Sequence, residues 1–221
     1  MISAEQFAHQ NSVWHIATPS LEQFLRWMNH NLRHIGPPIA AMSDPLRNSF
    51  IAEAAFTAAA TTGTITEAES VARGRVTKLP RGRSARSSLT PLENSEAGMI
   101  RDRLLQYTMS ATVAPVYRPS FAGSGVVDDA VGDIYLPSAE ELVEVKAVQR
   151  WFRGSDLRQV LTYASLAGEG TPVTSVTLLN PRLGIFYKSS CEDLAQDIGA
   201  GSWVELRLGL LDFMSGLALS D

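Results

Sequence analysis

The chain has 221 residues and a formal net charge of −4, and 45% of its residues are apolar. This length allows one domain, or one domain with an elaboration, and the composition is that of a globular protein with a substantial core. The single cysteine, Cys191, excludes an intramolecular disulfide and a cysteine metal site. The sequence has no apolar run near the ~20 residues of a membrane helix and no signal-peptide pattern, so we expect a cytoplasmic protein without a membrane partner.

The first predicted elements are helices. An apolar stripe behind a capping residue, Ser20, predicts a helix over residues 21–35. An alanine-rich helix is predicted over residues 44–61, and a shorter one from Thr66 by the same capping logic. We therefore expect residues 1–72 to form an N-terminal helical region.

A basic segment follows at residues 73–89. Six cations and no acid, interspersed with Gly, Ser and Pro, predict an extended flexible loop, because like charges repel one another. The loop is interpreted equally well as an arm that contacts phosphates or as a solvated linker. Residues 1–90 hold nine Lys and Arg against six Asp and Glu, whereas residues 91–221 hold ten against seventeen. The cations of the predicted nucleic-acid contact are Arg73, Arg75, Lys78, Arg81, Arg83 and Arg86.

A long helix is predicted over residues 91–109. Thr90 and Glu93 form a capping box at its start, and Pro91 occupies the first helical position. Glu96 lies on the stripe that should face a sheet, so we expect its carboxylate to be buried.

Strands are predicted after this helix. Short extended runs occupy residues 113–117 and 121–127. A β-hairpin is then predicted from residues 132–136 and 141–148, because β-branched and aromatic runs flank the turn residues 137–140.

Charged side chains interrupt the apolar pattern of this hairpin. Strand alternation places Glu144 and Lys146 on one face and the intervening valine on the other. Asp133, on the partner strand, can reach the same face. Buried charges are costly unless they are paired or hold an ion. The pattern therefore predicts a place for a hard divalent cation and a phosphate.

A capped helix over residues 155–168 follows the hairpin directly. Gln159 and Tyr163 are four residues apart and share one face of it, from which they can hydrogen-bond to water or phosphate at the predicted site. Strands at 173–179 and 184–188 and two more helices complete the chain.

Gly132-Asp133, Glu144-x-Lys146 and Gln159-x-x-x-Tyr163 together resemble the motifs of the PD-(D/E)XK nuclease superfamily, especially its RecB-like branch. A glycine stands where that motif has proline. The resemblance covers roughly residues 90–190. It implies an α/β fold with a mixed sheet: a restriction-endonuclease-like α-β-β-β-α-β core in residues 90–221, with an N-terminal all-α extension.

The resemblance also implies a metal site. Oxygen ligands favour Mg²⁺ or Mn²⁺ over zinc. Lys146 would stabilise charge on the phosphate or position the attacking water, with Gln159 and Tyr163 as supporting groups. The implied ligands are Asp133, Glu144, the carbonyl of Val145 and, from the first core helix, Glu96.

We therefore expect a Mg²⁺-dependent nuclease that hydrolyses DNA phosphodiester bonds, with DNA favoured over RNA as partner. The resemblance allows a role in a defence or repair complex, or a homodimer. Two alternatives stay open: a catalytically silent nucleic-acid-binding or assembly subunit on the same fold, and an RNase or structure-specific resolvase.

Overall fold

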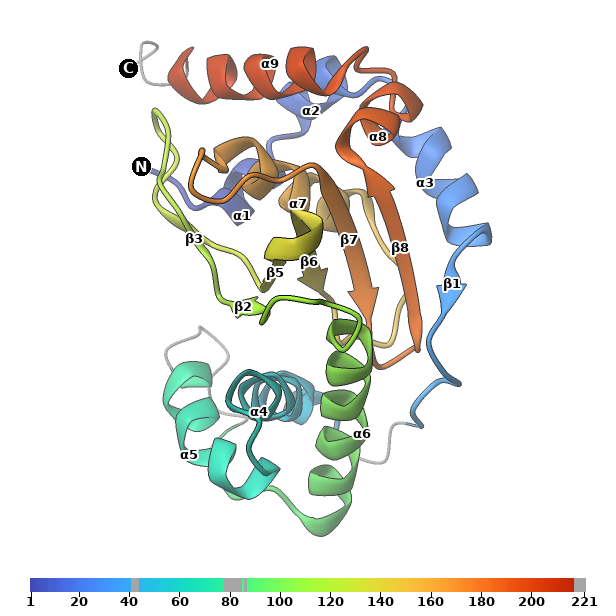
Figure 1. Cartoon of the computed structure of the whole chain (residues 1–221), viewed down its shortest axis with the longest axis vertical. Coiled ribbons are helices and arrows are strands. Elements are labelled where there is room, and N and C mark those ends of the chain that lie inside the picture. The colour runs from blue at the N-terminus through green and yellow to red at the C-terminus, as the bar shows by residue number, and fades with distance from the viewer. Residues whose placement is uncertain (41–43, 78–84, 86, 217–221) are drawn as a thin grey trace.

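A mixed β-sheet lies between two groups of helices in the computed structural model, which describes residues 1–40, 44–77, 85 and 87–216 (Figure 1). Its described strands follow the order β1-β8-β7-β6-β5-β2. β6 and β7 are parallel, and every other neighbouring pair is antiparallel. The prediction of an α/β protein with a mixed sheet is confirmed. These strands are β1 (Arg33–His34), β2 (Val116–Tyr117), β5 (Ile134–Leu136), β6 (Glu141–Val145), β7 (Ser175–Asn180) and β8 (Ile185–Ser190).

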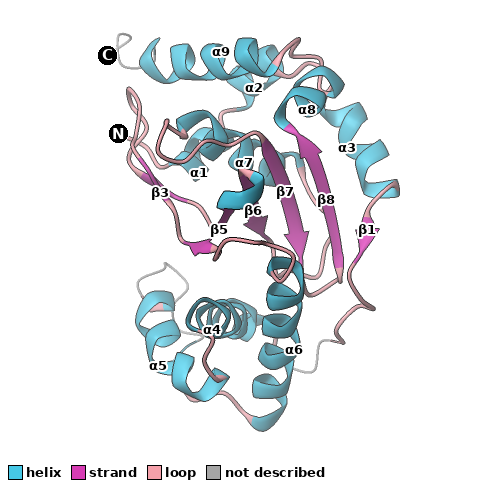
Figure 2. Ribbon diagram, in the orientation of Figure 1, coloured by secondary structure: helices cyan, strands magenta, loops and turns pink. Residues whose placement is uncertain are grey.

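Helices occupy most of the remaining chain (Figure 2). A short two-stranded ribbon, β3 (Ser120–Phe121) with β4 (Ala130–Val131), leaves the sheet between β2 and β5. None of the described helices is long and apolar enough to cross a membrane. The helices are α1 (Ala4–Ala8), α2 (Asn11–Ala17), α3 (Leu21–His30), α4 (Asn48–Thr61), α5 (Ile65–Val76), α6 (Pro91–Thr108), α7 (Gly154–Leu166), α8 (Cys191–Asp197) and α9 (Trp203–Gly216), with 3₁₀ turns η1 (Pro45–Arg47) and η3 (Pro137–Ala139).

The predicted hairpin is present as β5 and β6. The turn η3 and Glu140, which has a φ of 45°, join the two antiparallel strands. Side chains of β6 then alternate between the two faces of the sheet. Leu142 belongs to the hydrophobic core on one face, and Val143 belongs to the core on the other.

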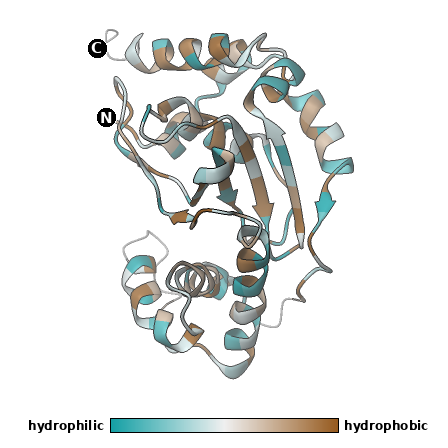
Figure 3. Cartoon of the chain, in the orientation of Figure 1, coloured by the Kyte–Doolittle hydropathy of each residue, from teal (hydrophilic) through white to brown (hydrophobic). Residues whose placement is uncertain are grey.

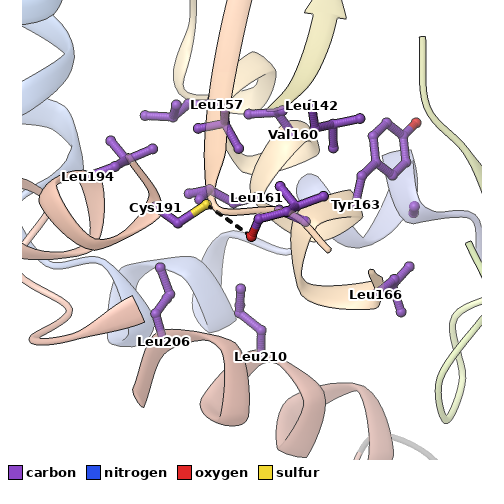
Figure 4. Packing of buried hydrophobic residues seen from close by; sticks show 14 of the residues in the cluster. Leu142, Leu157, Val160, Leu161, Tyr163, Leu166, Cys191, Leu194, Leu206 and Leu210 are labelled. Carbon is purple, nitrogen blue, oxygen red and sulfur yellow. Dashed lines mark hydrogen bonds between the residues drawn. The ribbon is translucent and has the colours of Figure 1, made fainter. Parts of the chain in front are cut away.

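Each face of the sheet packs against its own helix. α7 covers the face that carries Leu142, and its residues Leu157 and Leu161 lie in that core (Figure 4). On the opposite face, Ile100 and Leu104 of α6 belong to the same core as Val143. Apolar residues are concentrated on β6 and β7 (Figure 3), as expected of strands that are buried on both faces.

The helices of residues 1–72 divide between these two cores. α1, α2 and α3 contribute Phe7, Trp14 and Phe24 to the core beside α7. α4 and α5 contribute Phe50 and Ala72 to the core beside α6, and Figure 1 shows both helices next to α6, away from α8 and α9. The N-terminal helices are therefore part of the packing on both sides of the sheet.

The helix predicted over residues 21–35 ends earlier than expected. α3 stops at His30, and Ser20 makes no side-chain capping hydrogen bond. Arg33 and His34 instead pair with β8 and form an edge strand of the sheet. The apolar stripe predicted a longer helix because hydrogen bonding to a strand some 150 residues away leaves no trace in the local periodicity.

The capping box at Thr90 and Glu93 is confirmed, and α6 begins at Pro91 as predicted. Glu93 has an additional role, because its two carboxylate oxygens accept hydrogen bonds from Arg47 Nε and Nη2 at 2.8 and 2.9 Å. These hydrogen bonds from Arg47 are the main reason that the pKa of Glu93 is lowered to about 2.

A fully buried ion pair joins α6 to the turn between β7 and β8. Arg182 Nη1 donates to Glu96 Oε1, and both side chains have no exposed surface. Arg182 Nε also donates to the carbonyl of Ala147 at 3.2 Å. Asn180 holds the turn itself, because its Oδ1 accepts from the backbone amides of Arg182 and Leu183 at 3.1 and 3.0 Å.

Glu96→Gln should lower the free energy of unfolding by about 3–5 kcal/mol, because the substitution leaves the Arg182 charge buried without its anion. Urea denaturation measures the loss. The double variant Glu96→Leu/Arg182→Met, which removes both charges, should recover most of the stability. A change within about 0.5 kcal/mol for Glu96→Gln, as at an ordinary surface site, would contradict this assignment.

Candidate active site

Asp133, Glu144 and Lys146 meet where β5 begins and β6 ends. Asp133 directly precedes β5, and its Oδ2 accepts a hydrogen bond from the backbone amide of Val145 at 2.7 Å. Lys146 Nζ donates to Glu144 Oε1 at 2.8 Å. The hairpin thus brings together the three charged residues that the sequence selected.

The predicted Gln–Tyr pair completes a chain of hydrogen bonds from the hairpin to α7. Lys146 Nζ donates to Gln159 Oε1 at 2.6 Å, and Gln159 Nε2 donates to the Tyr163 hydroxyl at 2.8 Å. Tyr163 lies at the edge of the α7 core (Figure 4) and stacks on Phe121 at 6.2 Å. Lys146 is therefore held from two elements, β6 and α7.

Burial controls the electrostatics of the two acids. Glu144 is 3% exposed, and burial together with the nearby Asp133 carboxylate raises the pKa of Glu144 to about 8. Burial also raises the pKa of Asp133, although the Val145 amide and Lys146 act against it. For Lys146, burial lowers the pKa but the Glu144 carboxylate raises it, and the net pKa is above the ordinary value.

One carboxylate oxygen of this cluster has no hydrogen-bond partner among the described residues. Glu144 Oε2 is buried and finds no hydrogen-bond partner in the described part of the chain. A buried acceptor without a donor is costly, so such an atom indicates a ligand position. With the Asp133 carboxylate and the carbonyl of Val145, it offers the all-oxygen donor set that suits Mg²⁺ or Mn²⁺.

Glu96 does not join this set. It was expected as a third acid, and it is buried on the predicted face of α6, but its carboxylate pairs with Arg182. Across the described residues, no group of three or more His, Cys, Asp and Glu side chains is placed to hold a metal ion. Any metal at this position would rely on Asp133 and Glu144 alone among the acids, together with backbone oxygen.

Two residues that the sequence did not select lie beside Asp133. Arg118 Nη2 donates to Glu53 Oε1 at 2.5 Å, and the Arg118 backbone amide donates to the Asp133 carbonyl at 2.8 Å. Glu53 is the single charged residue of α4, and an isolated carboxylate in an alanine-rich helix is a signal that could have identified it. Nothing in the sequence around Arg118 marks it.

A pocket of about 1200 Å³ opens at this junction, between the sheet and the segment formed by η1 and α4. Its polar lining includes Asp133, Lys146, Glu53 and Arg118, and its apolar lining includes Phe56 of α4 and Ile100 and Leu104 of α6. Asp133 and Lys146 of the candidate site therefore line a cavity large enough for a ligand.

The basic segment begins later than predicted. Helix α5 is capped by Thr64 and Glu67, rather than from Thr66, and continues to Val76. Arg73 and Arg75 are thus helical, and they form ion pairs with Glu69 at 2.5 Å and Glu53 at 3.1 Å. The expected loop contacts at Lys78, Arg81, Arg83 and Arg86 lie outside the described residues.

Comparison with known proteins does not assign the chain to a family. No family model matches it, and neither a curated protein nor a solved structure is significantly similar. The functional interpretation therefore depends on the geometry of the site.

In EDTA, the protein should lose stability as the pH rises from about 4.5 to about 8. The Glu144 pKa rises from an ordinary 4.5 to about 8 on folding, so the folded state binds more protons than the unfolded state throughout that interval. The unfolding free energy therefore falls with increasing pH. Urea denaturation across this range measures the slope, which Glu144→Gln should flatten. An equal slope in wild type and variant would show that Glu144 is not the titrating group.

Proposed function

We propose that the protein is a Mg²⁺- or Mn²⁺-dependent nuclease that hydrolyses phosphodiester bonds, with DNA as its substrate in preference to RNA. One observation carries the proposal: among the described residues, Glu144 has a buried oxygen without a hydrogen-bond partner, next to Asp133 and Lys146, which line a large pocket. In this arrangement the two carboxylates can bind a metal ion, and the lysine can stabilise the charge of a phosphate.

The order of elements supports the same proposal. From residue 91 the chain forms α6, β2, β5, β6, α7 and β7, which is the helix–strand–strand–strand–helix–strand sequence of the PD-(D/E)XK core. The ribbon of β3 and β4 is inserted between the first two of these strands. The motif residues occupy the second strand, the third strand and the second helix, or the positions next to them.

Each residue then has a distinct part in the chemistry. Asp133, Glu144 and the Val145 carbonyl would hold the cation, and the cation would supply Lewis-acid activation of the phosphodiester and of the attacking water. Lys146 stays protonated beside Glu144 and stabilises negative charge that develops on the phosphate. Gln159 fixes the direction of the Lys146 ammonium, and Tyr163 fixes Gln159.

Asp133→Asn, Glu144→Gln and Lys146→Ala should each lower the rate of metal-dependent cleavage by about 100-fold or more. The melting temperature of the two carboxylate variants should be unchanged or higher in EDTA, because each removes repulsion between neighbouring acids. The assay uses linear, circular and single-stranded DNA and an RNA strand, each with Mg²⁺, Mn²⁺ or EDTA.

Lys188→Ala is the matched control. Lys188 also pairs with a buried glutamate of β6, Glu141, but on the opposite face of the sheet. Its loss should leave the cleavage rate unchanged. Full activity in Lys146→Ala, or no cleavage of any substrate by wild type with either metal, would refute the proposed function.

A further inference from the structure

Arg118 has an unusual backbone conformation beside the candidate site. Its φ of 59° lies in the left-handed region, which residues other than glycine rarely adopt, and a proline follows it. The residue stands at the point where the chain leaves β2 for β3. Backbone hydrogen bonds from Arg118 to Asp133 at 2.8 Å and from Gly132 to Pro119 at 2.9 Å fix this junction. Strain that the surroundings maintain in this way is typical of functional positions.

The Arg118 guanidinium has donor capacity left. Nη2 binds Glu53, and the group lies 4.8 Å from the centre of the Phe56 ring. Nε is buried and has no hydrogen-bond partner among the described residues. Among the described residues, two other cations line the pocket, but Arg47 binds both oxygens of Glu93, and Lys146 binds Glu144 and Gln159.

Glu53, the carboxylate that pairs with Arg118, also accepts hydrogen bonds from other residues. Glu53 Oε1 also accepts from Arg75 Nη1 at 3.1 Å and from Thr57 Oγ1 at 3.2 Å. If the Arg118 guanidinium moved to another anion, Glu53 would keep a cationic partner and a hydroxyl donor. The exchange would therefore not leave the Glu53 carboxylate without a positive partner. An unpaired buried charge is what usually makes it costly to break an ion pair of this kind.

We propose that Arg118 binds a phosphate group in the pocket, by exchanging Glu53 for two phosphate oxygens. Nε and Nη2 lie on the same edge of the guanidinium and form the fork that matches a phosphate in a bidentate contact. Arg118 lines the same pocket as Asp133 and Lys146 of the candidate site. That the phosphate belongs to a nucleic acid rests on the proposed function, whereas the phosphate site itself does not.

Arg118→Gly removes the whole side chain, and with it the guanidinium, while glycine keeps the left-handed backbone without strain. Arg101→Gln is the matched control, since it removes a cation of α6 that pairs with Asp102 and lies outside the lining of the pocket. Two probes are used in EDTA: inorganic phosphate, followed by thermal denaturation, and a short fluorescein-labelled single-stranded DNA, followed by anisotropy.

Phosphate should raise the melting temperature of wild type and of Arg101→Gln, and not that of Arg118→Gly. The affinity for the DNA should fall about tenfold or more in Arg118→Gly, as expected for the loss of a charged hydrogen bond. An equal phosphate response in Arg118→Gly and wild type, or no response in wild type, would overturn the inference. An Arg118-dependent phosphate response without metal-dependent cleavage would support the phosphate site and refute the nuclease proposal alone.

Discussion

The ammonium group of Lys146 is the contact on which the candidate site depends. It bonds to Glu144 at 2.8 Å and to Gln159 at 2.6 Å, and so joins the end of β6 to α7. Because α7 is the crossover between the parallel strands β6 and β7, the fold itself sets the distance that Lys146 spans. Without this cation, the buried Glu144 and Asp133 carboxyl groups would lose a positive charge that favours their ionised forms.

Strand β6 carries a second buried glutamate, Glu141, with which Glu144 can be compared. Glu141 and Glu144 are both nearly fully buried and lie on opposite faces of the sheet. Glu141 has every oxygen occupied: Tyr107 and Thr177 donate to Oε1 at 2.6 and 2.7 Å, and Lys188 donates to Oε2. Glu144 has one oxygen bound to Lys146 and one with no partner among the described residues. The first arrangement is a closed structural network, whereas the second has a place for a ligand.

The parts of the structure that the sequence predicted are those determined by local chemistry. The β5–β6 hairpin follows from its turn residues, the start of α6 from the Thr90–Glu93 cap, and the spacing of Gln159 and Tyr163 from the helical period. The errors involve contacts between distant segments. The pairing of β1 with β8 and the partner of Glu96, a residue 86 positions away, have no local signature.

The contribution of α4 to the pocket shows the same limit. Local patterns predicted this helix, but not that Glu53 would meet Arg118, 65 positions further along the chain. That meeting depends on the path of the chain between β2 and β3, where a left-handed residue before a proline turns the backbone toward Asp133. Propensity rules disfavour this conformation, so a sequence-based prediction would not choose it.

Proton release on metal binding tests the central claim most directly. Because the pKa of Glu144 is raised to about 8, the carboxyl is mostly protonated near neutral pH and must lose its proton to become a ligand. Isothermal titration calorimetry with Mg²⁺ or Mn²⁺, in buffers of different ionisation enthalpy, should detect one bound ion and release of about one proton near neutral pH. Glu144→Gln should abolish both. Binding of the metal with the same proton release in Glu144→Gln, or no binding by wild type, would contradict the account.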